Sequence, residues 1–157
     1  MNEGWLEILG KMPYGIYVLT SRFGERINGM VASWVSQISY DPPLLMVAVH
    51  PNRYSHELIK KSGHFTLHLI SRNQKGLISR FKGSDPRAKF DTLSWTEGKT
   101  ECPILLECIG HMECVVKESY SPGNHTLFIG EIIDAKMRSN EEPMSTSDYE
   151  GTYTGMR

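Results

Sequence analysis

Hydrophobic runs, cysteines and net charge are all scarce in this sequence. The longest apolar stretch, residues 44–49, is far shorter than the roughly 20 residues that a membrane-spanning helix needs. The net charge of 157 residues is only −1, which argues against a nucleic-acid partner. Three cysteines at intervals of six fit neither a disulfide framework nor a C-x-x-C zinc site. We therefore interpret them as reduced thiols packed like small hydrophobic side chains, with a metal or redox role as the alternative.

Several motifs that identify common enzyme classes are also missing. The sequence contains no G-x-G-x-x-G, no P-loop and no G-x-S-x-G nucleophile elbow. Its first ten residues include two acids and no basic region followed by an apolar one, unlike a signal peptide. We therefore expect a cytoplasmic protein without a membrane or nucleic-acid partner. The length suits one domain, 1–157, in which the polar residues 138–157 form a C-terminal arm.

The pattern of apolar residues predicts a mainly β protein. Amphipathic segments at 3–11, 53–61 and 73–81 predict short helices. Strands and helices do not alternate strictly, so an antiparallel Greek-key split β-barrel with two or three short flanking α-helices is favoured over a doubly wound parallel sheet. Runs rich in β-branched or alternating apolar residues predict strands over 16–20, 27–34, 35–40, 44–50, 64–70, 103–108, 111–119 and 126–137.

The segment 28–39 combines small residues and hydroxyl groups with an otherwise apolar pattern. Gly29 allows a ligand or another backbone to approach closely. Ser33 and Ser36 offer hydroxyls to the polar edge of a ligand, and Trp34 offers a large flat face. A planar heterocycle with polar edges needs this kind of surface. The alternative is an ordinary half-buried strand whose serines face water.

The segment 50–59 ends a predicted strand and begins a predicted helix. The N-terminus of a helix presents free N–H groups and the positive end of the helix dipole, which suit a phosphate. Arg53 adds a guanidinium group and Ser55 adds a hydroxyl. The alternative is helix capping by Asn52 or Ser55, which is compatible with phosphate binding.

Histidines stand at a turn and along one strand. His125 follows the turn signal 121–124, so it is either a surface residue or one that orients a substrate or relays a proton near neutral pH. His64 and His68 alternate along one predicted strand without an obvious third metal ligand. We interpret these two as structural or exposed side chains.

Together these segments resemble the flavin reductase-like family, whose fold is the FMN-binding split barrel. The resemblance extends from about Met12 to Met137 and rests on five pieces in the right order. The Ala-Ser-Trp-Val-Ser-Gln form of the second piece is most similar to the flavoredoxin-like and rubredoxin-associated branch. The five pieces are 15–20, 28–44, 55–59, 62–65 and 125–131.

The resemblance implies roles for individual residues. In such proteins the second piece lines the isoalloxazine ring and ribityl chain, and the strand end and loop after it lie near the ribityl chain and phosphate. A position matching 81–82 closes over the cofactor, and His125 sits by the nicotinamide as the catalytic residue. Asn124 and Ser33 depart from the aspartate and asparagine of many members. The implied cofactor-binding residues are Asn28, Ser33, Trp34, Val35, Ser36, Ala48, Val49, Asn52, Arg53, Ser55, Phe81 and Lys82.

The activity that the resemblance implies is electron transfer through a bound FMN, or alternatively FAD. NAD(P)H or a redox protein would supply electrons, and free flavin, a ferric chelate or a redox protein would accept them. The alternative is a non-enzymatic FMN electron carrier that docks to a rubredoxin-like or flavodiiron protein. A structural or ligand-sensing barrel is a third interpretation. The family is typically homodimeric, with each flavin near the subunit interface.

Overall fold

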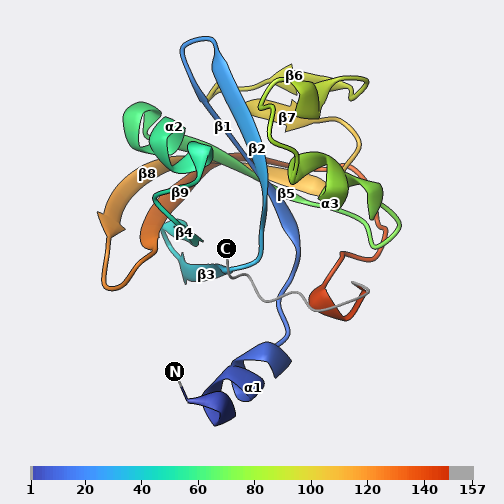
Figure 1. Ribbon diagram of the computed structural model, residues 1–157. Helices are drawn as coiled ribbons and strands as arrows, with labels where there is room; N and C mark the ends of the chain where they lie inside the picture. The colour runs from blue at the N-terminus through green and yellow to red at the C-terminus, as the bar shows by residue number, and fades with distance from the viewer. Residues whose placement is uncertain (1, 149–157) are drawn as a thin grey trace.

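The computed structural model describes residues 2–148 (Figure 1). Most of the regular structure in this part of the chain is β. In chain order the elements are α1 (Glu3–Lys11), β1 (Tyr17–Phe23), β2 (Arg26–Ala32), β3 (Val35–Tyr40), β4 (Pro43–Val49), α2 (Tyr54–Ser62), β5 (His64–Leu69), α3 (Gly76–Phe81), η1 (Ala88–Phe90), β6 (Trp95–Glu97), β7 (Pro103–Leu105), β8 (Gly110–Tyr120), β9 (Thr126–Met137) and η2 (Thr146–Asp148).

Seven of the strands form one antiparallel sheet in the order β2-β1-β5-β8-β9-β4-β3. Figure 1 shows β1 and β2 running across the direction of β8 and β9, as in a strongly coiled sheet. The described pairings leave β2 and β3 with a partner on one side only, so the sheet does not close into a full barrel. The predicted fold class, a mainly β antiparallel split barrel with two or three short helices, is confirmed.

The central strands are buried on both faces. Leu19 of β1 packs in one apolar cluster with Val47 and Phe65, whereas its neighbour Val18 packs in a second cluster with Phe81. Successive side chains of a strand point to opposite faces, so β1 must be apolar at adjacent positions. The second cluster also takes residues from α3, η1 and the small sheet β6–β7, which therefore cover that face.

One buried histidine joins the large sheet to the small one. The Nδ1–H of His68 donates to the carbonyl oxygen of Val18 over 3.1 Å, and its Nε2 accepts the N–H of Leu105 over 3.0 Å. Burial is the main cause that lowers the pKa of His68 from 6.5 to about 3. His68 is thus a neutral structural residue, as its position on the strand predicts.

The three cysteines are free thiols with buried side chains. Burial raises the pKa of Cys102 to about 11 and that of Cys114 to about 12. It also raises the pKa of Cys108 above its ordinary value. Their packing is that of small hydrophobic residues, as predicted.

Helix α1 covers the predicted residues 3–11, whereas the helix predicted at 73–81 is shorter at its start. The apolar face of α1 is not buried: Trp5 and Ile8 are 43% and 68% exposed, and Figure 1 shows the helix standing away from the sheet. Helix α3 begins at Gly76 rather than at residue 73. Its expected first turn is instead a loop in which Ser71 N donates to the side chain of Gln74 over 2.8 Å, and such side-chain bonds compete with helix formation.

The described part of the C-terminal arm packs on its own chain. Met144 is buried in the second apolar cluster, and bridges join Gly15 to Ser145 and Ser71 to Pro143. The remaining arm, 149–157, lies outside the described residues. Within residues 2–148 no helix is long and apolar enough to cross a bilayer, and no three metal-ligating side chains converge.

Candidate functional site

The predicted flavin-lining residues lie where β3 and β4 meet. Trp34 stands in the connection between β2 and β3, and its carbonyl oxygen accepts the N–H of Ala48 over 3.0 Å. Val35 pairs with Val47 of β4, while Ser36 is exposed on the edge strand β3. The site therefore has a half-buried indole and an edge strand with accessible polar groups.

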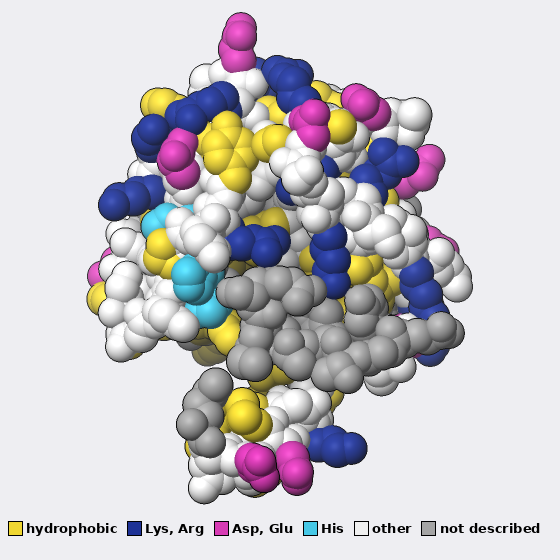
Figure 2. Space-filling view, viewed as in Figure 1, with side chains coloured by type: hydrophobic (Ala, Val, Ile, Leu, Met, Phe, Trp, Pro, Cys, Tyr) yellow, Lys and Arg dark blue, Asp and Glu magenta, His cyan; other side chains and the backbone are white. Residues whose placement is uncertain are grey.

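Histidine side chains gather beside this indole. The ring of His125 packs on Trp34 with a centroid distance of 4.6 Å, and His50 meets His125 edge to face at 5.2 Å. His56 lies on the adjoining helix α2 and forms a 2.8 Å hydrogen bond with Thr126. Figure 2 shows histidine side chains together on one face of the molecule, next to Lys and Arg side chains.

One hydrogen bond of the His125 side chain indicates which ring nitrogen carries the proton. Its Nδ1 lies 2.8 Å from the side-chain oxygen of Asn124, which only accepts, so Nδ1 carries the proton and Nε2 is an acceptor. Burial, followed by the charge of His50, lowers the pKa of His125 below its ordinary value. The imidazole is thus neutral at neutral pH and presents Nε2 as a hydrogen-bond acceptor.

A polar network lies under the start of α2. The amide nitrogen of Asn28 donates to the hydroxyl of Ser55 over 2.9 Å, and both side chains are buried. The ammonium of Lys89 donates to the amide oxygen of Asn28 over 2.9 Å and to the carbonyl of Gly29 over 2.8 Å. Burial, followed by the charge of Arg53, lowers the pKa of Lys89 to about 8. Two cations therefore approach each other beside a buried hydroxyl.

Residues 9–157 match the family model described as flavin reductase like domain. The chain belongs to this family. Ferric-chelate reductase (NAD(P)H) of Archaeoglobus fulgidus is 30% identical over 148 residues, covering 92% of this chain and 88% of the relative. A high molecular weight rubredoxin of Moorella thermoacetica is also 30% identical, over 90% of this chain. This chain spans only 63% of the length of that rubredoxin.

Solved structures of flavin reductases have the same architecture. The NADH:FAD oxidoreductase SgcE6 of Streptomyces globisporus, in complex with NAD and FAD fragments, has a TM-score of 0.80 and 27% identity. The match covers 88% of this chain and 83% of that one. The flavin reductase HpaC complexed with NADP+ has a TM-score of 0.84 over 98% of this chain and 97% of that one. Its 23% identity makes this a similarity of fold.

Most residues that the resemblance to flavin reductases implies lie in these two adjoining clusters. Trp34, Val35, Ala48 and His125 belong to the strand region, which also contains Ser33, Ser36 and Val49. The loop and helix start after β4 carry Asn52, Arg53 and Ser55, and Asn28 reaches Ser55 from β2.

Phe81 has a different place from the one expected. It is fully buried, its ring lies edge to face with Phe90 at 5.5 Å, and a Cβ added to Gly29 would lie 2.5 Å from it. Phe81 therefore supports Gly29 from within the core instead of closing over a ligand. Lys82 follows at the C-cap of α3 and is exposed.

The sequence interpretation assigned no role to three side chains of the site: His50, His56 and Lys89. The two histidines belong to the segment 50–59, which the sequence predicts to bind phosphate. The sequence does not show that their side chains lie beside His125 and Thr126. Lys89 lies between the predicted helix at 73–81 and the predicted strand at 103–108. No local pattern indicates that its ammonium is buried against residues about sixty positions earlier.

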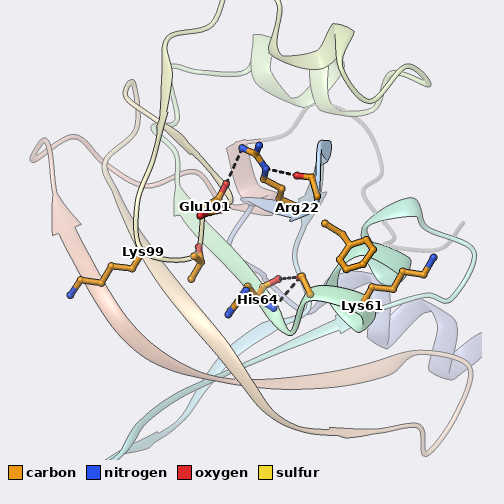
Figure 3. A pocket seen from close by; sticks show the side chains of 9 residues that line it. Arg22, Lys61, His64, Lys99 and Glu101 are labelled. Atoms are coloured by element: carbon orange, nitrogen blue, oxygen red, sulfur yellow. Dashed lines mark hydrogen bonds between the residues drawn. The ribbon is translucent and has the colours of Figure 1, made fainter.

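A pocket of about 390 Å³ is lined by none of the predicted site residues. Figure 3 shows that its lysines, Lys61 and Lys99, extend in different directions. Arg22 is paired with Glu97 over 2.5 Å and bonds the carbonyl of Gly24 over 2.8 Å. The cations of this pocket are thus either far apart or paired with a carboxylate. The pocket is therefore a poorer phosphate site than the cluster beneath α2.

Proposed function

We propose that this chain is an NAD(P)H-dependent flavin oxidoreductase that holds FMN between the Trp34 region and the start of α2. The observation that carries the proposal is the course of the segment 48–55. Its first residues lie against Trp34 and His125, and its last residues lie beside Lys89 and Asn28. One continuous stretch of chain thus joins an aromatic platform to a cationic, hydroxyl-bearing cluster.

The residues present fit a flavin phosphate. Lys89 and Arg53 form no ion pair with a carboxylate in the described part of the chain, so their charges lack a protein counterion. The hydroxyl of Ser55 accepts from Asn28, which leaves its own proton for an anionic acceptor. Donors of this kind suit a phosphate monoester. FMN is therefore favoured, and FAD, named for the relative from Streptomyces globisporus, is the alternative.

The chemistry of a bound flavin is acceptance of a hydride from a nicotinamide and onward transfer of the electrons. The protein contributes position. The backbone of 33–36 and the exposed hydroxyl of Ser36 hold the ring edge, and Trp34 shields one side. Neutral His125 presents Nε2 to the N–H groups of the nicotinamide carboxamide. No side chain needs to transfer a proton for the hydride step, and near-contact geometry dominates its rate.

The second candidate function is an FMN electron carrier for a redox protein. It is favoured by the 30% identity to a protein named as a rubredoxin and by the presence of Asn124, which is aspartate in many reductases of the family. In this case a rubredoxin-like or flavodiiron protein docks near the flavin, and His125 has no nicotinamide to orient.

We also propose a cytoplasmic homodimer with the flavin near the subunit interface. The edge strand β3 exposes Ile38 and Tyr40, the latter 88% exposed, and α1 exposes Trp5 and Ile8. Both elements expose large apolar side chains, and β3 has a partner strand on one side only in the described chain. β3 also carries residues of the flavin site. Light scattering of the purified protein, with Ile38→Asp as the disrupting variant, distinguishes a dimer from a monomer.

The deciding experiment is the absorption spectrum of the purified protein after incubation with FMN. Bleaching of the flavin band by NADH or NADPH under anaerobic conditions, at a rate compatible with turnover, establishes the reductase. A bound flavin that only a reduced redox protein bleaches establishes the electron carrier. Failure to bind flavin refutes both.

A further inference from the structure

We propose that Lys89 is a positioning and specificity-determining residue that makes this site select phosphorylated flavins over riboflavin. The inference rests on the proposed function, because it concerns the phosphate end of the same flavin site. It goes beyond that function in assigning the selection to a buried lysine and in predicting that the selection is lost in alkaline solution.

The surroundings of Lys89 are unusual for an ammonium group. Its residue exposure is only 8%, and the two hydrogen bonds that it makes go to neutral acceptors, Asn28 and Gly29. An ammonium has three N–H donors, and the third finds no acceptor among residues 2–148. Buried charges are normally paired, because removing a charge from water costs several kcal/mol. The missing counterion is therefore expected to come from a ligand.

The same amide group connects Lys89 to the start of α2. Asn28 accepts from Lys89 through its oxygen and donates to Ser55 through its nitrogen, so the ammonium fixes the amide orientation. The Asn28 amide in turn fixes the hydroxyl of Ser55 beside Arg53. Lys89 thus sets the direction of a neutral donor and adds a charge to the same small region.

The charges around Lys89 have one sign. Arg53, at the N-cap of α2, is the charged group whose field acts on Lys89, and it disfavours the ammonium form. β2 presents only a neutral amide and a carbonyl oxygen to Lys89. On its own loop, Asp85 accepts backbone N–H groups and Arg87 donates to the carbonyl of Glu25. A phosphate dianion would remove the repulsion between the two cations.

This arrangement predicts linkage between proton binding and phosphate binding. Without an anion the pKa of Lys89 is about 8, so the side chain loses its charge in mildly alkaline solution. A bound phosphate raises that pKa, since an opposite charge favours the ammonium. The preference for FMN over riboflavin is therefore present below pH 8 and declines above it. Between pH 8 and 9 we expect a decline of about fivefold, set by titration of one group.

The test compares dissociation constants of FMN and riboflavin, measured by calorimetry on flavin-free protein. For Lys89→Met we expect FMN to bind roughly 10- to 100-fold more weakly, as for loss of a charge-assisted hydrogen bond. Riboflavin binding should change by less than about twofold. Lys75→Met, an exposed lysine at the N-cap of α3, is the matched control and should alter neither constant.

The pH profile gives a second readout that needs no variant. The ratio of the FMN and riboflavin constants cancels any titration of the shared ring system, so its decline above pH 8 reports the phosphate subsite. Lys89→Arg keeps the charge throughout this range and should flatten the decline. A flat wild-type ratio, or equal weakening of both flavins by Lys89→Met, overturns the inference while leaving the proposed function intact. Absence of binding by either flavin refutes the proposed function itself.

Discussion

Two buried bases, His68 and Lys89, stand in opposite situations within the same fold. Both ring nitrogens of His68 are satisfied by backbone groups of Val18 and Leu105, so the neutral imidazole is complete in itself. Lys89 has one donor more than it has acceptors in the described chain and lies beside Arg53. A buried base whose hydrogen-bonding groups all have protein partners supports the fold. A buried base with a donor that has no protein acceptor indicates a ligand.

The largest effect on stability is expected at His68, whose ring nitrogens both have protein partners. His68→Leu removes the acceptor of the Leu105 N–H and one donor to the Val18 carbonyl, both in the core. We expect the free energy of unfolding to fall by about 2–4 kcal/mol, measured by urea denaturation. His64→Leu, four positions earlier on β5 and only half-buried, should stay within about 0.5 kcal/mol of the wild type. Equal losses at the two positions would contradict the assigned role of His68.

Acid should weaken the same contact. The folded state holds the pKa of His68 near 3, against 6.5 in the unfolded chain, so the unfolded state binds the proton more tightly. Stability is therefore complete above pH 6.5 and declines as the pH falls toward 3. The contribution of this group is up to about 1.4 kcal/mol per pH unit, visible as a slope in unfolding free energy against pH. The slope should be smaller in His68→Leu; an unchanged slope would assign it to other groups.

A smaller effect is expected where the core supports the Lys89 region. Gly29→Ala places a Cβ 2.5 Å from the ring of Phe81, so the ring or the strand must shift. We expect a loss of about 1–3 kcal/mol in unfolding free energy, together with weaker FMN binding, because the carbonyl of Gly29 holds Lys89. Gly10→Ala in α1 meets nothing within 4 Å and should be neutral or slightly stabilising. If Gly29→Ala lowers stability but leaves FMN affinity unchanged, the packing of Phe81 on Gly29 does not affect the flavin site.

The smallest effect concerns His125. Its replacement by alanine removes one acceptor for the nicotinamide and the ring packed on Trp34. We expect the KM for NADH to rise about tenfold, the value of one hydrogen bond, with FMN binding changed by less than about threefold. Steady-state kinetics and flavin titration measure the two quantities separately. An unchanged KM would contradict the nicotinamide role of His125 and leave the reductase function intact.

The same contrast explains how far the sequence could be interpreted. Strands β1, β4 and β9 could be predicted from local runs of apolar and β-branched residues. Glycine and proline indicated the turns that end such runs. The hydroxyl-rich segment at 33–36 indicated a ligand surface for the same local reason. The burial of Lys89 depends on η1 lying against β2, which no window of sequence contains. Likewise, an amphipathic pattern predicted α1 but not whether its own chain would cover it.

The cysteines give this protein an internal reporter of opening. Reagents that alkylate or oxidise thiols act on accessible thiolates, and Cys102, Cys108 and Cys114 are neither accessible nor ionised near neutral pH. The protein thus keeps its thiol groups away from dissolved oxidants. Each thiol lies in or beside the main sheet, so its labelling has to wait for the strands around it to separate. The labelling rate therefore measures how often the barrel opens, with and without flavin.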